Sequence, residues 1–268
     1  MPSPVAVVSA VRTPIGRFLG AFRELAAPAL GREAVRGALQ AARVAPEEVE
    51  TLFFGHGRQA GSGPNPARQV LIGAGIPQEA PAATINQACS SGLKSIQLAA
   101  DEIRLGRVRI AVAGGMESMS RVPFFLDRMR FGYRLGSTAV VDGMYRDGFF
   151  CPLSEMVMGE TAELLARERG ISRQEQDAFA LESQRKAAAA IEAGRFREEI
   201  VPVSVKGGKG ETVVAADEHP RPDTSLEKLG RLVTVFDREH GTVTAGNSSG
   251  ITDGAAALVL MDAGEAER

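Results

Sequence analysis

The sequence predicts an α/β fold that is interrupted by a mainly helical insertion. Strand patterns and amphipathic helix patterns alternate up to about residue 120, and one more apolar strand pattern occurs at 255–261. Strands that are separated by helices pair in parallel through right-handed crossovers. We therefore expect an α/β portion at 1–120, an inserted portion at 121–242, and a final strand portion at 243–268 that completes the first.

The α/β portion contains four strand patterns, each a short run of apolar or β-branched residues. They span Val5–Ser9, Thr51–Gly55, Ala83–Ile85 and Arg109–Ala113, and the last pattern ends at Gly114-Gly115. Helix patterns lie between them at 29–42, from Asn65 onward, and at 92–104. Asn65 predicts an N-cap, and Pro66 suits the first helical position after it.

The insertion begins with a region without periodicity, from about 120 to 155. A stretch of this length without regular structure is usually functional or covers another part of the protein. Two helices are expected next, at 158–170 and from the capping box Ser172–Glu175 to about Ala193, with Gly194 as a helix stop. A hairpin turning at Lys206–Gly210 and a short helix at Leu226–Leu232 complete the insertion, and a strand-and-turn segment at Gly241–Gly250 leads into the final strand portion.

Composition excludes several classes of function. The chain has 268 residues and a net charge of −2, so it lacks the overall positive charge that would attract nucleic acid. It has no Trp and only two Tyr, which leaves few aromatic side chains on which bases could stack. No apolar run reaches the length of about 20 residues that spans a bilayer, and the N-terminus lacks a signal-peptide pattern. Two cysteines do not form a disulfide framework, so we expect a reducing, cytoplasmic location without membrane contact.

Cys89 is the residue that carries most information about function. It lies in Asn86–Gly92, between the strand pattern at Ala83–Ile85 and the helix pattern that follows. The start of a helix favours an anion such as a thiolate, which is the nucleophilic form of cysteine. Small neighbours also let a substrate carbonyl approach the backbone. On this segment alone, a buried structural cysteine is an open alternative.

Several segments together resemble one family, the thiolases, which comprise acetyl-CoA acetyltransferases and 3-ketoacyl-CoA thiolases. The matching segments cover nearly the whole chain in family order. They are Arg12–Gly16, Asn65–Gln69, Asn86–Gly92, Gly114–Ser120, Met158–Glu163, Gly241–Gly250 and Asp253–Ala256.

The resemblance implies a mixed five-stranded sheet with helices on both faces and an inserted loop subdomain that holds coenzyme A. It implies that Cys89 accepts the acyl group in thiolysis of acetoacetyl-CoA or 3-oxoacyl-CoA, or in the reverse Claisen condensation, without a metal. The backbone N–H of Cys89 would help to bind the oxyanion. Acyl-CoA is then the small-molecule partner, and a homo-oligomer is expected, with contacts at 124–150.

The resemblance also implies residues that bind coenzyme A. Met158, Phe236, Ala245 and Ser249 match positions along the pantetheine channel, and Arg221 matches a position near the adenine and phosphate end. Lys228 and Arg231 would add positive charge there. A solvated basic surface is the alternative reading of these three cations.

Some family features have no match in this sequence. They are an Asn, a His in a Gly-His-Pro segment that activates the nucleophile, and a second catalytic Cys, whose position Cys151 does not match. We therefore expect the chain to be catalytically incomplete by itself. The alternative function is a non-catalytic module that binds coenzyme A and works with a separate polypeptide supplying the C-terminal half.

Two positions depart from the family pattern. His56 stands where relatives more often have a neutral amide followed by Val, and we interpret it as a structural residue rather than the catalytic base. His219 and His240 are expected to face solvent. Val157 stands where many short-chain biosynthetic members have a His, so the sequence does not favour acetoacetyl-CoA as the sole substrate.

Overall fold

The computed structural model describes residues 4–207 and 210–267, which form two compact units. The first unit contains the chain up to Val122, the segment Arg197–Glu218, and the residues from Thr252 onward. The second unit contains Pro123–Phe196 and His219–Ile251. The chain therefore passes between the units four times.

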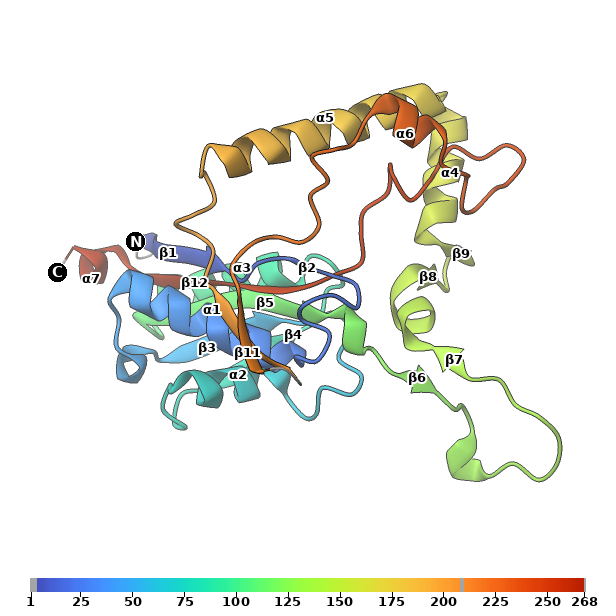
Figure 1. Cartoon of the computed structure of the whole chain (residues 1–268). Helices are drawn as coiled ribbons and strands as arrows, with labels where there is room; N and C mark the ends of the chain where they lie inside the picture. The colour runs from blue at the N-terminus through green and yellow to red at the C-terminus, as the bar shows by residue number, and fades with distance from the viewer. Residues whose placement is uncertain (1–3, 208–209, 268) are drawn as a thin grey trace. The chain divides into compact units, whose positions relative to one another are not determined.

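A mixed sheet forms the centre of the first unit, with the strand order β1-β12-β5-β3-β4 (Figure 1). Its strands are β1 (Val5–Arg12), β12 (Thr252–Asp262), β5 (Ile110–Ser118), β3 (Thr51–Gly55) and β4 (Ala82–Ile85). The pairs β3–β4 and β3–β5 are parallel, whereas β12 is antiparallel to both β1 and β5. This confirms the expected mixed five-stranded path, to which the two-residue strand β2 (Gly16–Arg17) is added by pairing with β12.

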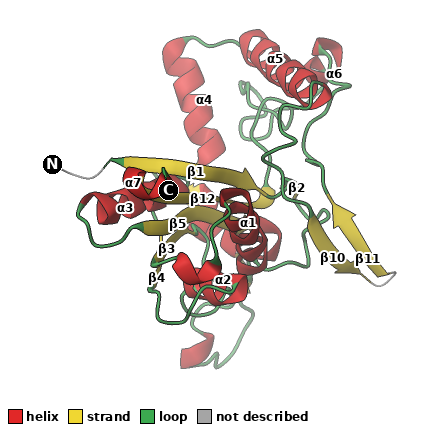
Figure 2. Ribbon diagram, turned by 90° about the vertical axis from the view of Figure 1, so that its left-hand side faces the viewer, coloured by secondary structure: helices red, strands yellow, loops and turns green. Residues whose placement is uncertain are grey.

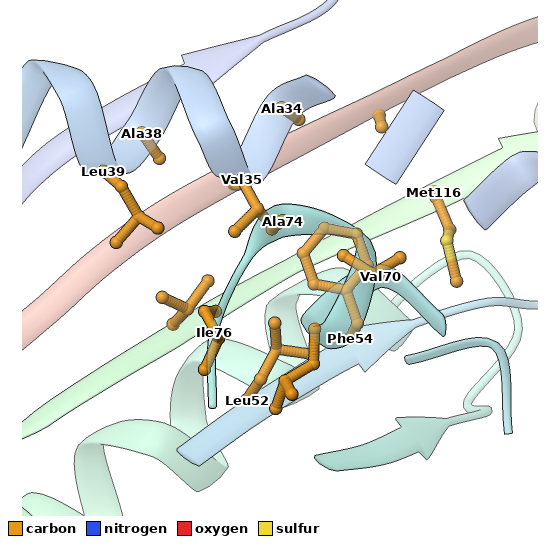
Figure 3. Packing of buried hydrophobic residues seen from close by; sticks show 14 of the residues in the cluster. Ala34, Val35, Ala38, Leu39, Leu52, Phe54, Val70, Ala74, Ile76 and Met116 are labelled. Atoms are coloured by element: carbon orange, nitrogen blue, oxygen red, sulfur yellow. The ribbon is translucent and has the colours of Figure 1, made fainter. Parts of the chain in front are cut away.

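Helices cover both faces of this sheet (Figure 2). On one face, α1 (Ala27–Ala42) and α2 (Pro66–Ala74) pack against Leu52, Phe54 and Val112 in the larger apolar core (Figure 3). On the other face, α3 (Ser91–Arg104) packs in a smaller core that includes Ala111 and Ala113. Neighbouring residues of β5 enter different cores because side chains of a strand alternate between its two faces.

The strand β5 does not end at Gly114-Gly115, as the sequence predicted, but continues to Ser118. A Cβ on Gly114 would lie 2.1 Å from the carbonyl oxygen of Ala256 in β12. These glycines therefore allow close approach of a neighbouring strand rather than terminating β5.

The segment Arg197–Glu218 carries the hairpin of β10 (Val203–Gly207) and β11 (Gly210–Val214), as predicted around Lys206–Gly210, although residues 208 and 209 of its turn lie outside the described part. Arg12 fixes this segment to β1. Its guanidinium donates to Glu199 and, through two nitrogens at 2.7 and 3.0 Å, to Asp217. The compact units consequently divide the chain at other points than the predicted domain boundaries, and those boundaries stay a prediction.

The second unit contains three helices, α4 (Met158–Arg169), α5 (Arg173–Glu192) and α6 (Leu226–Gly230). The capping box is confirmed, because Ser172 N–H donates to the Glu175 carboxylate at 2.7 Å and Glu175 N–H donates back to the Ser172 hydroxyl at 3.3 Å. Two short hairpins precede α4, formed by β6 (Phe124–Phe125) with β7 (Val141–Asp142) and β8 (Phe150–Cys151) with β9 (Met156–Val157). Short single-turn helices also occur in the second unit, at Met129–Phe131 and Tyr145–Phe149. The first unit has similar turns at Pro46–Glu48 and Met119–Arg121, and the short helix α7 (Ala263–Ala266) follows β12 there.

The ion pair between Arg12 and Asp217 gives the first unit a testable pH dependence. Burial alone would raise the pKa of the Asp217 carboxyl, but hydrogen bonds from Arg12 and from Ile15 N–H outweigh it and lower this pKa. A lowered pKa stabilises the fold above the unfolded-state value of about 3.9, and the stabilisation is lost as the pH falls through the folded-state value. We expect Asp217→Asn to lower the free energy of unfolding by about 1–3 kcal/mol at pH 7, and by progressively less below about pH 4.

Urea denaturation at a series of pH values measures this difference. Asp101→Asn is the matched control, because Asp101 pairs with Arg104 while its side chain is 57% exposed. The control should change the free energy of unfolding by less than about 0.5 kcal/mol. Equal losses in the two variants at pH 7 would contradict the anchoring role of Asp217.

Candidate functional site

Cys89 lies in the turn that connects β4 to α3, directly before Ser90, the N-cap residue of that helix. Its side chain is exposed, so the alternative of a buried structural cysteine is wrong. The preceding residue, Ala88, has a φ of +50°, a left-handed conformation that is uncommon for residues other than glycine. Such backbone conformations persist only where surrounding contacts fix them, and they cluster at functional sites.

Hydrogen bonds hold the Cys89 turn in this conformation. The Ser91 hydroxyl accepts from Gln87 N–H at 2.8 Å and donates to the Ala88 carbonyl at 2.5 Å. The Asn86 side chain accepts from Ala88 N–H at 3.1 Å and donates to the Gly57 carbonyl at 3.0 Å. Because Ser91 is buried, its two bonds are protected from competition with water.

Glycines bring the start of α3 close to the ends of the neighbouring strands. A Cβ on Gly55, the last residue of β3, would lie 2.5 Å from the backbone nitrogen of Gly92. A Cβ on Gly115 in β5 would lie 3.3 Å from the Gly92 Cα. Cys89 is therefore presented at the edge of the sheet where parallel strands have their carboxyl ends, the usual place for active sites in α/β folds.

The first turn of α3 offers donors to an anion. The N–H groups of Gly92 and Leu93 have no acceptor within residues 4–207 and 210–267. Unpaired N–H groups and the helix dipole together favour negative charge at this end of a helix. A thiolate, or an oxyanion formed from a bound carbonyl group, is the kind of charge that they would stabilise.

Glu117 lies beside this turn and was not predicted as a site residue. Its carboxylate accepts from the N–H groups of Gly57 and Arg58 at 3.0 and 3.2 Å, and it lies 3.1 Å from Nε2 of His56. His56 is buried, in agreement with the structural role expected of it. The only sequence signal for Glu117 was its place at the carboxyl end of a strand, in the segment Gly114–Ser120.

Asp253 anchors the end of β5 from the neighbouring strand. Its carboxylate accepts from the Ser120 N–H and hydroxyl at 2.9 and 2.6 Å. Burial raises the pKa of the Asp253 carboxyl, and the bonds from Ser120 only partly oppose this shift. The family segment that begins at Asp253 thus has a structural role in the described chain.

Within the second unit, Phe236 and Met158 lie close to each other. The Phe236 ring packs against Gly159, where a Cβ would lie 1.9 Å from the ring carbon Cε2. Gly159 follows Met158, whose side chain is exposed, at the start of α4. This contact brings together two of the residues predicted to line the pantetheine channel.

The segment Gly241–Gly250 does not form the predicted strand, because side chains of two helices take its polar groups. The buried Glu163 carboxylate in α4 accepts from Thr242 N–H, from the Thr242 hydroxyl and from Val243 N–H, at 2.8–2.9 Å. The Asn247 amide donates to Asp177 in α5 at 3.0 Å. Ala245 and Ser249 are exposed on this anchored segment, so they are available to a ligand.

The predicted cations differ in their pairing. Lys228 bonds to Asp223, and Arg231 pairs with Glu227 on its own helix turn. Arg221 is exposed and forms no salt bridge within the described residues, while its backbone N–H donates to the Gln184 side chain in α5. Of the three, Arg221 has the charge that is most available to an anionic ligand.

Cys89 belongs to the first unit, whereas the residues predicted to bind coenzyme A all belong to the second. The structure therefore describes the surroundings of Cys89 and those of the predicted coenzyme A residues separately, each within its own unit. In the part of the chain that the structure describes, no cluster of His, Cys, Asp and Glu has the arrangement of a metal site. None of the described helices has the length and apolarity needed to span a bilayer.

Comparison with known proteins decides the family. Residues 5–264 match the family model described as thiolase, N-terminal domain. The chain belongs to the thiolase family.

Similar thiolases are found among bacterial proteins. The acetyl-CoA acetyltransferase of Escherichia coli strain K12 is 49% identical to this thiolase over 257 residues, 96% of this chain and 65% of that protein. The acetyl-CoA acetyltransferase of Cupriavidus necator is 47% identical over 98% of this chain and 67% of that protein. The structure of acetyl-CoA acetyltransferase from Syntrophomonas wolfei matches with a TM-score of 0.96 at 39% identity, covering all of this chain and 67% of that one. The chain thus spans about two thirds of the length of these relatives.

The hydrogen bonds of Ser91 in this thiolase give a prediction about the Cys89 turn. Ser91→Ala removes a buried hydroxyl that bonds to Gln87 N–H and to the Ala88 carbonyl, so both backbone groups lose a partner. We expect the free energy of unfolding to fall by about 1–3 kcal/mol, measured by urea denaturation. The control is Ser90→Ala, because the exposed Ser90 hydroxyl bonds only to the Gln87 carbonyl, and its loss should cost less than half as much. An equal effect of the two variants would contradict the proposed importance of Ser91.

Proposed function

We propose that this chain accepts an acyl group from acyl-CoA on Cys89, as its part in acyl transfer to and from coenzyme A. Full turnover would need the further catalytic residues that have no match in this sequence. The observation that carries the proposal is the exposed Cys89 thiol on a turn that Ser91 and Asn86 hold at the start of α3. Membership of the thiolase family supports it, as do relatives that are named acetyl-CoA acetyltransferases.

The chemistry begins at the Sγ atom of Cys89. In the reaction with acetyl-CoA, the Cys89 thiolate attacks the thioester carbonyl carbon, and the coenzyme A thiolate leaves as acetyl-Cys89 forms. In thiolysis of a 3-oxoacyl-CoA, the thiolate attacks the C3 carbonyl carbon and the bond between C2 and C3 breaks, which leaves the acyl group on Cys89. The departing carbanion becomes acetyl-CoA by taking a proton, which a residue of the predicted partner polypeptide would supply, and the thiol of a second coenzyme A then takes the acyl group from Cys89. Backbone N–H groups at the start of α3, with that of Cys89, are suited to the negative charge on the attacked oxygen.

The second unit would bind the cofactor portion of the substrate. Met158 and Phe236 supply an apolar surface, while Ala245 and Ser249 lie on the segment that Glu163 and Asp177 anchor. Arg221 is exposed and forms no salt bridge within the described residues, so its charge suits a phosphate group of coenzyme A. Lys228 stays part of the proposal, although its bond to Asp223 must compete with any phosphate. A homo-oligomeric state, a partner with further catalytic residues and the cellular location stay predictions.

Intact-protein mass spectrometry after incubation with acetyl-CoA tests the acyl transfer. We expect a mass gain of one acetyl group that is absent in Cys89→Ala. Cys151→Ala is the matched control and should keep the adduct. Hydrogen bonds from the Ser154 side chain, and then from the Ser154 and Leu153 backbone, lower the pKa of Cys151, so this control excludes acetylation at a second activated thiol. An adduct that survives Cys89→Ala would overturn the assignment of the nucleophile.

Calorimetric titration with coenzyme A tests the role of Arg221. We expect Arg221→Ala to weaken binding about three- to tenfold, because one exposed charge-assisted hydrogen bond to phosphate is lost. Arg104→Ala is the charge-matched control, since Arg104 lies on α3 in the other unit and pairs with Asp101. Equal affinities of the two variants would contradict the role of Arg221.

A further inference from the structure

His56 lies next to the turn that carries Cys89, and it is only 1% exposed. Its backbone N–H donates to the carbonyl of Ile85, the last residue of β4, at 2.9 Å. On its side chain, Nε2 lies 3.1 Å from Oε1 of Glu117. By contrast, Nδ1 has no hydrogen-bond partner in the described part of the chain.

The contact with Glu117 defines which ring nitrogen of His56 donates a hydrogen bond. A carboxylate accepts hydrogen bonds and does not donate them, so the 3.1 Å contact of Nε2 with Glu117 requires a proton on Nε2. The proton is therefore assigned to Nε2, which donates to the Glu117 carboxylate. His56 thus acts on its neighbours through one directed, charge-assisted hydrogen bond.

Glu117 connects this hydrogen bond to the turn. Its carboxylate also accepts from Gly57 N–H at 3.0 Å, and a Cβ on Gly57 would lie 3.1 Å from Glu117 Oε2 and 3.6 Å from the Ala88 carbonyl oxygen. The Gly57 carbonyl accepts from Asn86, which in turn accepts from Ala88 N–H. Continuous contacts therefore join His56 to Ala88, the residue with positive φ that precedes Cys89.

We propose that His56 is a positioning residue that holds the Cys89 turn through Glu117 and Gly57. This inference deepens the proposed acyl transfer and rests on the role of Cys89 in it. The side chain fixes the orientation of the Glu117 carboxylate, which fixes Gly57 and thereby the Asn86 side chain that bonds to Ala88. When this support is lost, the Cys89 thiol is no longer held beside the N–H groups at the start of α3, which have no acceptor within the described residues.

Two substitutions of similar size separate the directed hydrogen bond from packing. In His56→Gln, the amide nitrogen reaches the position of Nε2 and can still donate to Glu117. In His56→Asn, the amide nitrogen reaches only the position of Nδ1, so the bond to Glu117 is lost. The measurement is the rate of iodoacetamide labelling of Cys89 at pH 7, with Cys151 of the second unit as the internal reference in the same molecule.

We expect His56→Asn to slow the labelling of Cys89 relative to Cys151 about three- to tenfold, which is the effect of losing one such hydrogen bond. His56→Gln should restore the rate to within about twofold of the unmodified chain. Equal slowing in both variants would show a packing role only, and an unchanged rate in His56→Asn would show no role, so either result overturns the proposal.

Glu117→Gln provides a second test that does not alter His56, in case His56→Asn fails to fold. It replaces the charged acceptor by a neutral amide of the same shape, and the labelling of Cys89 should slow by a similar factor. An unchanged rate in a folded Glu117→Gln protein would overturn the proposal. Failure of the proposed function is seen separately, as absence of acetylation of the unmodified chain by acetyl-CoA, because alkylation by iodoacetamide needs no acyl transfer.

Discussion

The close approach of α3 to the sheet determines the geometry of the candidate site. Gly55 and Gly92 meet at a distance that leaves no room for a Cβ on Gly55, and Gly115 approaches the Gly92 Cα from the next strand. This contact fixes the position of the start of α3 relative to the ends of the strands. The turn that carries Cys89 must therefore connect β4 to a helix start whose position is already determined. The positive φ of Ala88 is the local cost of that connection, and the buried Ser91 hydroxyl offsets it with two hydrogen bonds.

In the second unit, the segment Gly241–Gly250, for which we propose contact with coenzyme A, has little regular structure. Buried carboxylates hold it in place of the hydrogen bonds of a sheet. Glu163 accepts from the backbone N–H groups of Thr242 and Val243, and Asp177 accepts from the side-chain amide of Asn247 while it pairs with Arg173. An irregular segment held in this way can expose small residues such as Ala245 and Ser249 without losing its position.

Local patterns in the sequence predicted most strands and helices, because periodicity and end signals such as Asn65, Ser172 and Gly194 act within a few residues. The errors concern interactions between distant residues. Gly114 resembles a strand end until β12 is placed beside it, and the segment Arg197–Glu218 joins the first unit through Arg12, 205 residues before Asp217. In the candidate site, the motif around Cys89 could be predicted because it is continuous in the sequence. The contact of His56 with Glu117 could not, because it joins the residue that follows β3 to a residue of β5, and only the fold brings these two together.

The position of β12 in the sheet has a consequence for synthesis of the chain. This strand lies between β1 and β5, yet the ribosome makes it more than 130 residues after β5 ends. Until then, β1 and β5 lack the neighbour that each of them pairs with, and their backbone edges can pair with other chains. The nascent first unit is therefore expected to depend on chaperones, and its folding rate to be limited by the closure of a long loop rather than by helix formation.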